Sequence, residues 1–225
     1  MMLLCYSYVV LVILISSKID RFLHISAKVS RKFLHVMIGN LPFVIPFFTS
    51  DSFPVLVAAP FVLVTLMVSP YSPFPSIGRR LVGLTGITEE GHRLGLVFYA
   101  ISYTALALVF ASKPYVIAAG ILPMAYGDSA ASIVGERYGR RRYRVFSNKS
   151  LEGSAAMFLV SFLSLSTGLI LFSTLYSFSV SSKILAVLAT TIVATLAEFY
   201  SPSGSDNLSV PVLSALTFLA LSGDV

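Results

Sequence analysis

The sequence has few charged residues and almost no cysteine. Asp, Glu, Lys and Arg make up 12% of the 225 residues, roughly half the share that soluble domains carry. The single cysteine, Cys5, excludes an internal disulfide and a metal site built from several cysteines. The three histidines belong to no zinc signature or Ser-His-Asp order, and the chain contains no GxxxxGKS or GxxxxGKT phosphate loop. These absences argue against zinc enzymes, serine hydrolases and P-loop enzymes.

Apolar residues dominate what remains. They make up 56% of the chain, and the mean hydropathy is +0.86, as expected for an integral membrane protein. The ten-residue alternation of a membrane β-barrel is absent, so residues 1–225 are expected to form one all-α membrane domain. We expect a bundle of about eight transmembrane helices, or seven if one segment is re-entrant. The apolar segments are 2–17, 33–49, 53–69, 94–111, 114–134, 153–173, 183–199 and 208–222.

The first apolar run, from Met1 to Ser17, has the composition of a signal peptide but not its charge pattern. A signal peptide has basic residues before its apolar region, whereas Lys18 and Arg21 follow this one. We therefore expect a retained membrane anchor, with a cleaved leader as the alternative.

Basic residues are concentrated in alternate loops. Of the 16 Lys and Arg, only Lys113 and Lys183 fall in the other set of loops. By the positive-inside rule, the basic loops are cytoplasmic and both termini are outside, in a cell or endoplasmic-reticulum-type membrane. The same rule explains the net charge of +6 without a nucleic-acid partner. Most of the acids lie at or near this face, Glu89 and Glu90 in a polar loop, so the site is expected to meet cytosolic ligands.

Asp128 lies near the cytoplasmic end of the segment 114–134, directly after Gly127. An unpaired carboxylate inside a membrane span costs about 2.5–3.5 kcal/mol on insertion scales and usually has a function. Binding of Mg²⁺ is the functional interpretation, because Mg²⁺ takes one or two carboxylates together with substrate phosphates. The alternative is an ion pair with an arginine of the loop 136–149.

The loop 136–149 leads into a helix start that is typical of phosphate sites. Its five arginines are expected to be solvated or to contact lipid headgroups, and none is assigned a role of its own. Ser147 or Asn148 is expected to cap the helix. Free backbone N–H groups, a lysine and small side chains there favour anion binding, whereas a capped and tightly packed helix start is the alternative. The residues concerned are Lys149, Ser150, Glu152, Gly153 and Ser154.

Arg31, His35 and Gly39 recur at intervals of four residues in the second segment, so they share one helical face. A guanidinium and an imidazole on one face, with a glycine that permits close helix approach, are suited to phosphate binding. The alternative is that Arg31 and Lys32 anchor the helix at the interface, with His35 a bundle histidine.

Two more acids flank the turn between the last two segments. Glu198 lies at the C-terminal end of its helix, where the helix dipole disfavours a carboxylate. Asp206 and Asn207 open the next helix, where Asp206 alone would fit a plain N-cap. We expect Glu198 and Asp206 to complete a site that begins at Asp128.

Three blocks of these residues resemble the polyprenol kinase family, which contains dolichol kinases, phytol kinases and related CTP-dependent lipid kinases. The blocks follow the family's order over residues 31–211, and the middle one is fairly specific. They are Arg31-Lys32-x-x-His35-x-x-x-Gly39; Gly127-Asp128-x-x-Ala131 with Gly135, Gly139 and Lys149-Ser150-x-Glu152-Gly153-Ser154; and Glu198 with Asp206-Asn207-x-x-Val210-Pro211.

The resemblance implies transfer of a phosphoryl group from CTP to the hydroxyl of an isoprenoid alcohol of the dolichol, phytol or geranylgeraniol type, with Mg²⁺. Asp128 and Asp206 are then expected on Mg²⁺, while Glu198 supports the metal or accepts the alcohol proton. Ser129 and Ser132 depart from the family, because phytol kinases tend to carry Gly and Asp there.

The same resemblance implies a set of phosphate-binding groups. Lys149, Arg31 and the helix N-terminus after the basic loop would hold phosphates, and Glu152 would orient Lys149. The other candidates for nucleotide or phosphate binding are His35, Gly127, Ser150, Gly153, Ser154 and Asn207.

Two other functions compete with this interpretation. A CTP:phosphatidate cytidylyltransferase shares the Gly-Asp step, but its Pro-Gly-His-Gly-Gly and Asp-Arg-x-Asp motifs are missing here. A membrane transporter would hold its polar residues near the midplane and often shows inverted repeats, whereas the polar residues here gather at one face.

Overall fold

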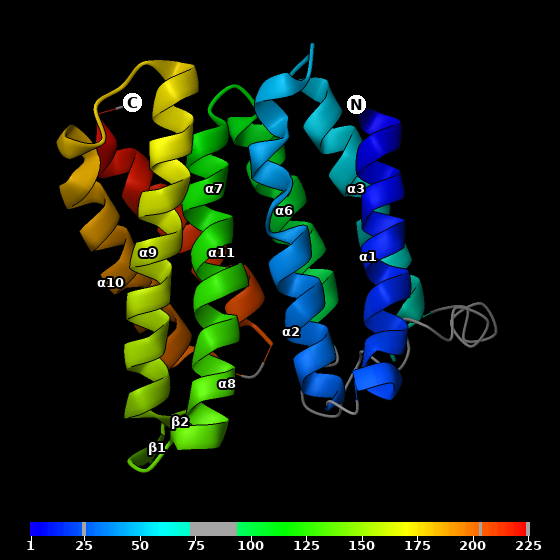
Figure 1. The fold of residues 1–225 in the computed structure, drawn as a ribbon, viewed down its shortest axis with the longest axis vertical. Helices are drawn as coiled ribbons and strands as arrows, with labels where there is room; N and C mark the ends of the chain where they lie inside the picture. The colour runs from blue at the N-terminus through cyan, green and yellow to red at the C-terminus, as the bar shows by residue number, and fades with distance from the viewer. Residues whose placement is uncertain (24–25, 73–93, 203, 224–225) are drawn as a thin grey trace.

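The computed structural model describes residues 1–23, 26–72, 94–202 and 204–223, which form an all-α bundle with one small β-ribbon (Figure 1). The expected polar loop with Glu89 and Glu90 lies outside the described residues. The α-helices are α1 (Met2–Leu23), α2 (Ala27–Ile38), α3 (Ser52–Val68), α6 (Gly95–Phe110), α7 (Pro114–Leu122), α8 (Asp128–Tyr138), α9 (Leu151–Tyr176), α10 (Ile184–Tyr200) and α11 (Asp206–Ser222). Shorter elements are the 3₁₀ turns η1 (Leu41–Phe43), η2 (Ile45–Phe47) and η4 (Ser181–Lys183), the π-helical turn η3 (Pro123–Gly127), and the strands β1 (Arg142–Arg144) and β2 (Asn148–Ser150).

Each expected apolar segment contains a helix, but two details differ from expectation. The second segment is α2 followed by η1 and η2, because Pro42 and Pro46 lack the backbone N–H that a continuous helix needs. The cap of α9 is Ser150, whose hydroxyl accepts from the Gly153 N–H at 3.1 Å, so the expectation of a cap at Ser147 or Asn148 was wrong. These two residues lie instead in and beside the antiparallel ribbon, which delays the start of α9.

Four described helical stretches are long and apolar enough to cross a membrane, and three more apolar helices are shorter. The long ones are Met2–Ile19, Pro114–Tyr138, Leu151–Tyr176 and Ser181–Tyr200; the shorter ones are Ser52–Val68, Gly95–Phe110 and Asp206–Ser222. The structure therefore supports an all-α membrane bundle, and the count of eight spans stays a prediction.

The rod formed by α7, η3 and α8 runs through the middle of the bundle (Figure 1). Every residue of α7 is buried, since α6, α9 and α11 pack around it. The chain begins and ends at one end of the bundle, and β1 and β2 lie at the opposite end (Figure 1). Polar side chains of α2, α8, α9, α10 and α11 can therefore meet near the ribbon.

Close packing around η3 depends on glycine. A Cβ atom at Gly39 would overlap the Cβ of Ala125, and one at Gly127 would overlap the Ser161 hydroxyl. Gly39 thus lets α2 approach η3, and Gly127 lets η3 approach α9. Because Asp128 directly follows η3, these glycines also hold Asp128 close to both helices.

We predict that Gly39→Ala destabilises the bundle. The Cβ of Ala125 cannot rotate away, and overpacking of this kind costs about 1–3 kcal/mol. Gly168→Ala is the matched control, because its Cβ would meet the end of the Leu122 side chain at 2.8 Å and the Phe43 ring at an ordinary contact distance of 3.4 Å, and alanine favours a helix by up to about 1 kcal/mol. Thermal unfolding in detergent should show a lower midpoint for Gly39→Ala alone; equal losses in both variants would contradict this packing.

Candidate functional site

A polar cavity of about 480 Å³ lies between the ribbon end of α8, α9, α10, α11 and α2. This volume is in the range of small-molecule sites. Its lining carries cations and acids from segments far apart in sequence, with small residues between them. The charged lining residues are Lys28, Arg31, Lys32, Arg142 and Lys149 together with Asp128, Glu136, Glu198 and Asp206.

Asp128 forms a buried ion pair with Lys32 of α2. Both side chains are only 8% exposed, and the Lys32 ammonium donates a hydrogen bond to Asp128 Oδ2. Asp128 is the first residue of α8, directly after the π-helical turn η3, and such turns often occur at functional sites. The partner of Asp128 is therefore a helix lysine and not the loop arginine considered from the sequence.

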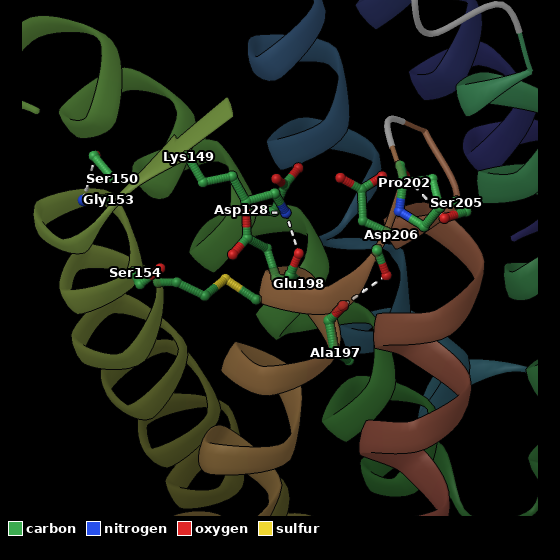
Figure 2. Close-up of polar contacts among 12 residues, drawn as sticks. Asp128, Lys149, Ser150, Gly153, Ser154, Ala197, Glu198, Pro202, Ser205 and Asp206 are labelled. Atoms are coloured by element: carbon green, nitrogen blue, oxygen red, sulfur yellow. Dashed lines mark hydrogen bonds and ion pairs between the residues drawn. The ribbon is translucent and has the colours of Figure 1, made fainter. Parts of the chain in front are cut away.

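Glu198 and Lys149 form the second ion pair of the cavity (Figure 2). Lys149 Nζ lies 2.6 Å from Glu198 Oε1 and also donates to the backbone oxygen of Glu198. This lysine offsets the unfavourable position of a carboxylate at the C-terminal end of α10. The other carboxylate oxygen, Oε2, is buried and has no hydrogen-bond partner among the described residues.

Asp206 lies across the cavity from this pair, at the first residue of α11 (Figure 2). Ser205 is the N-cap, so the plain-cap explanation for Asp206 does not apply. Asp206 is buried, and its Oδ1 accepts from the Asn207 N–H at 3.0 Å. Asn207 instead braces α6: its amide donates to the Gly95 oxygen at 3.1 Å, and its backbone oxygen accepts from Ser102 at 2.7 Å.

The ribbon is held over the cavity by Tyr143. Its ring stacks on Phe199 with the centroids 4.6 Å apart, and its hydroxyl is 2.5 Å from the Ser154 hydroxyl. Burial raises the pKa of the Tyr143 hydroxyl, so this group stays protonated at neutral pH. The contact fixes β2, and hence Lys149, against α9 and α10.

Four of the predicted site residues do not line the cavity. Glu152 accepts from the Arg141 N–H at 3.3 Å, and the expected Glu152–Lys149 contact is replaced by Lys149–Glu198. The reason is that Lys149 lies in an extended strand, where the helical i, i+3 spacing does not hold. The others are His35, Gly127 and Asn207, which pack or brace helices.

The remaining predicted residues do line the cavity, together with several to which sequence reasoning assigned no role, among them Lys32. Arg31, Ser150, Gly153 and Ser154 all face it. Lys32 was expected at most to be an interfacial anchor, but it is buried on Asp128. A helical wheel could have found it, because Lys28, Arg31, Lys32 and His35 share one face of α2.

The acids of the cavity can bind a hard cation such as Mg²⁺ only if a bound ligand supplies further oxygen atoms. Among the described residues, no group of three or more His, Cys, Asp and Glu is close enough to hold a metal ion. Mg²⁺, however, is commonly bound by one or two carboxylates plus substrate phosphates. The cavity therefore fits a metal that arrives with a polyphosphate, and not a metal caged by protein alone.

We predict that Lys32→Met lowers stability strongly, because it leaves the Asp128 carboxylate buried without its partner. Breaking a buried pair on one side costs about 3–5 kcal/mol. The double variant Lys32→Met/Asp128→Asn should recover most of that loss. As control, Lys28→Met breaks an exposed pair with Glu136, with 35% and 61% exposed side chains, and should change stability by less than about 1 kcal/mol.

Unfolding in detergent, followed by denaturant or heat, measures all three variants. Equal losses in Lys32→Met and Lys28→Met, or no recovery in the double variant, would contradict the buried pair.

No family model matches the chain, and no solved structure matches it. A phytol kinase of Synechocystis sp. is 33% identical over 221 residues, which cover 95% of this chain and 88% of that protein. A probable chloroplastic phytol kinase of Triticum aestivum is 32% identical over 148 residues, and the dolichol kinase of Saccharomyces cerevisiae is 30% identical over 146 residues.

The match with the cyanobacterial protein is nearly full-length for both chains. The matches with the wheat and yeast proteins cover 49% and 27% of their lengths. The long match, at this identity, includes the segments that build the cavity. The chain belongs to the polyprenol kinase family.

Proposed function

We propose that the protein is a membrane kinase that transfers the γ-phosphoryl group of CTP to the hydroxyl of an isoprenoid alcohol at the cytoplasmic face, with Mg²⁺. The observation that carries the proposal is one cavity in which Asp128, Glu198 and Asp206 meet Arg31, Lys32 and Lys149. The names of the relatives, phytol kinase and dolichol kinase, support the class of acceptor.

The cations of the cavity would bind the phosphates. Arg31 can grip two phosphate oxygens with its planar guanidinium, whereas Lys32 and Lys149 act as point charges. In phosphoryl transfer the protein mainly positions groups and neutralises charge, so a cluster of cations at the triphosphate supplies much of what catalysis needs. The N-terminus of α9, with Gly153 and Ser154 on the cavity, adds backbone dipoles.

The two ion pairs suggest how a nucleotide would enter. Each lysine now neutralises an acid, and a metal–nucleotide complex brings both an anion for the lysines and a cation for the acids. Lys32 and Lys149 would turn to phosphate oxygens while Asp128 and Glu198 turn to the metal. Charge compensation is kept throughout, so neither carboxylate is left buried and unpaired.

Oxygen donors for Mg²⁺ are available in the cavity. Asp128 and Asp206 are the proposed ligands, and Glu198 supports the metal or accepts the proton of the alcohol. The buried Glu198 Oε2, which lacks a hydrogen-bond partner among the described residues, fits either role. When bound, Mg²⁺ would neutralise negative charge on the transferred phosphoryl group.

The charge distribution of the loops supports the cytoplasmic orientation. Basic loops are retained in the cytoplasm, and Lys28, Arg31, Arg142 and Lys149 all belong to the end of the bundle that holds the cavity. A cytosolic nucleotide would reach the cavity from this side without crossing the bilayer.

Label transfer tests the function. The purified protein in lipid nanodiscs is incubated with γ-labelled or α-labelled CTP, or γ-labelled ATP, and with geranylgeraniol, phytol, dolichol or phosphatidate. We expect γ-label from CTP in the lipid product of an alcohol. Transfer of α-label with release of pyrophosphate would indicate a cytidylyltransferase instead, and no lipid label with any pair would contradict both.

We predict that Asp128→Asn lowers kcat/KM by at least about a hundredfold, because the neutral amide is a poor Mg²⁺ ligand and a poor partner for Lys32. Asp51→Asn is the matched control, since Asp51 is exposed before α3 with no side-chain cap bond. The measurement is initial rate against Mg²⁺ concentration for both folded variants. Full activity of Asp128→Asn would remove Asp128 from the metal site.

A further inference from the structure

A second cavity, of about 90 Å³, lies between α1, α2, α3 and α6. Val9 of α1, Leu34 and Ile38 of α2, Ala58 of α3 and Ala100 of α6 are among its walls. None of the charged residues of the polar cavity lines it, so it is a distinct space within the bundle.

The two cavities lie on adjacent faces of one helix. Arg31 and Lys32 face the polar cavity, whereas Leu34 and Ile38 face the second one. At about 100° per residue, these two faces of α2 are roughly a quarter of a turn apart. The apolar residues also lie one to two turns further along α2, toward the middle of the bundle.

His35 of α2 packs against Tyr99 of α6. Their ring centroids are 4.8 Å apart, and the Tyr99 hydroxyl donates to the backbone oxygen of His35 at 3.1 Å. His35 shares its helical face with Arg31, and Tyr99 lines the second cavity. The Tyr99 ring therefore contacts both the apolar space and the face of α2 that carries Arg31.

The chemistry of the second cavity suits hydrocarbon. The hydroxyls of Thr65 and Tyr99 are satisfied by backbone oxygens, Thr65 by Phe61 at 2.7 Å, whereas the buried hydroxyl of Tyr103 has no hydrogen-bond partner among the described residues. Almost all other lining residues are aliphatic or aromatic. Water needs two to four polar partners to occupy a buried space, so such a space favours an apolar occupant.

We propose that this cavity binds the hydrocarbon next to the hydroxyl of the alcohol substrate; the inference rests on the proposed function. A cavity of about 150 Å³ holds benzene, so 90 Å³ holds a few carbon atoms and not a whole isoprenoid chain. The rest of the isoprenoid chain would then lie against the outer surfaces of α1 and α3, which stand at the edge of the bundle (Figure 1). Their outer faces expose leucines such as Leu4 and Leu63, which suit contact with lipid.

Filling the cavity tests this placement. Ala100→Phe puts a ring into the space, and Ala105→Phe puts the same ring on an exposed position of the same helix. We expect Ala100→Phe to lower kcat/KM for the alcohol at least about tenfold, a usual effect of altering an apolar pocket. Its KM for the nucleotide and its unfolding midpoint should match those of Ala105→Phe. If both variants show equal kcat/KM for the alcohol while the wild type is active, the alcohol does not bind in this cavity, and the proposed function is unaffected.

Photo-crosslinking provides a readout that does not depend on turnover. Wild-type protein in nanodiscs is irradiated with an isoprenoid alcohol that carries a diazirine near the hydroxyl, and labelled peptides are mapped. The proposal is supported if the label lies on the residues of α2, α3 and α6 that line the cavity. Unlabelled alcohol should displace this label, and excess phosphatidylcholine should not. Label confined to other helices would overturn the proposal. Label displaced equally by phosphatidylcholine would also overturn it, because the cavity would then hold an ordinary acyl chain. A wild type without kinase activity in the label-transfer assay is the result that defeats the proposed function.

Discussion

Pairing of buried carboxylates with lysines is the constraint on which the polar end of the bundle depends. Asp128 and Glu198 lie among apolar helices, where an unpaired charge is costly. Lys32 is 96 residues from Asp128 in sequence, and Lys149 is 49 residues from Glu198. The two pairs therefore tie α2 to α8 and the ribbon to α10, so the same charges that need compensation also bring the walls of the cavity together.

Such pairs are weak evidence for stability as such. Well-packed apolar residues of similar volume are often as stable as a buried ion pair, or more so. The presence of these pairs in an otherwise apolar bundle is better explained by a role of the charges in ligand binding. A closed pair keeps each acid and each lysine desolvated and oriented, and a ligand of mixed charge can take the place of each partner at once. Preorganisation of this kind reduces what must be rearranged when the ligand binds.

Much of this arrangement could be predicted from the sequence, and the limits have clear physical causes. Hydropathy located the helical segments because a membrane-spanning run has a length that composition alone reveals. Asp128, Glu198 and Asp206 were recognised because carboxylates are conspicuous in apolar surroundings, and they do line one cavity. Lys32 was not assigned because its role depends on a partner on another helix. Glu152 was assigned to Lys149 because a helix was assumed to begin before Ser150, whereas the ribbon turns Lys149 toward α10 instead.

In the proposed function, α2 contacts the sites of both substrates, because its residues line the polar cavity and the apolar one. A nucleotide needs charged, hydrated surroundings, and a hydrocarbon chain needs surroundings without polar groups, yet their reacting atoms must come within about 3–3.5 Å of each other. A helix with one charged and one apolar face, at the polar end of the bundle, meets both conditions. His35 does not line the charged cavity; its ring packs on Tyr99, which lines the apolar one. The glycine that ends α2, Gly39, holds this helix against η3 and so keeps both faces in register with Asp128.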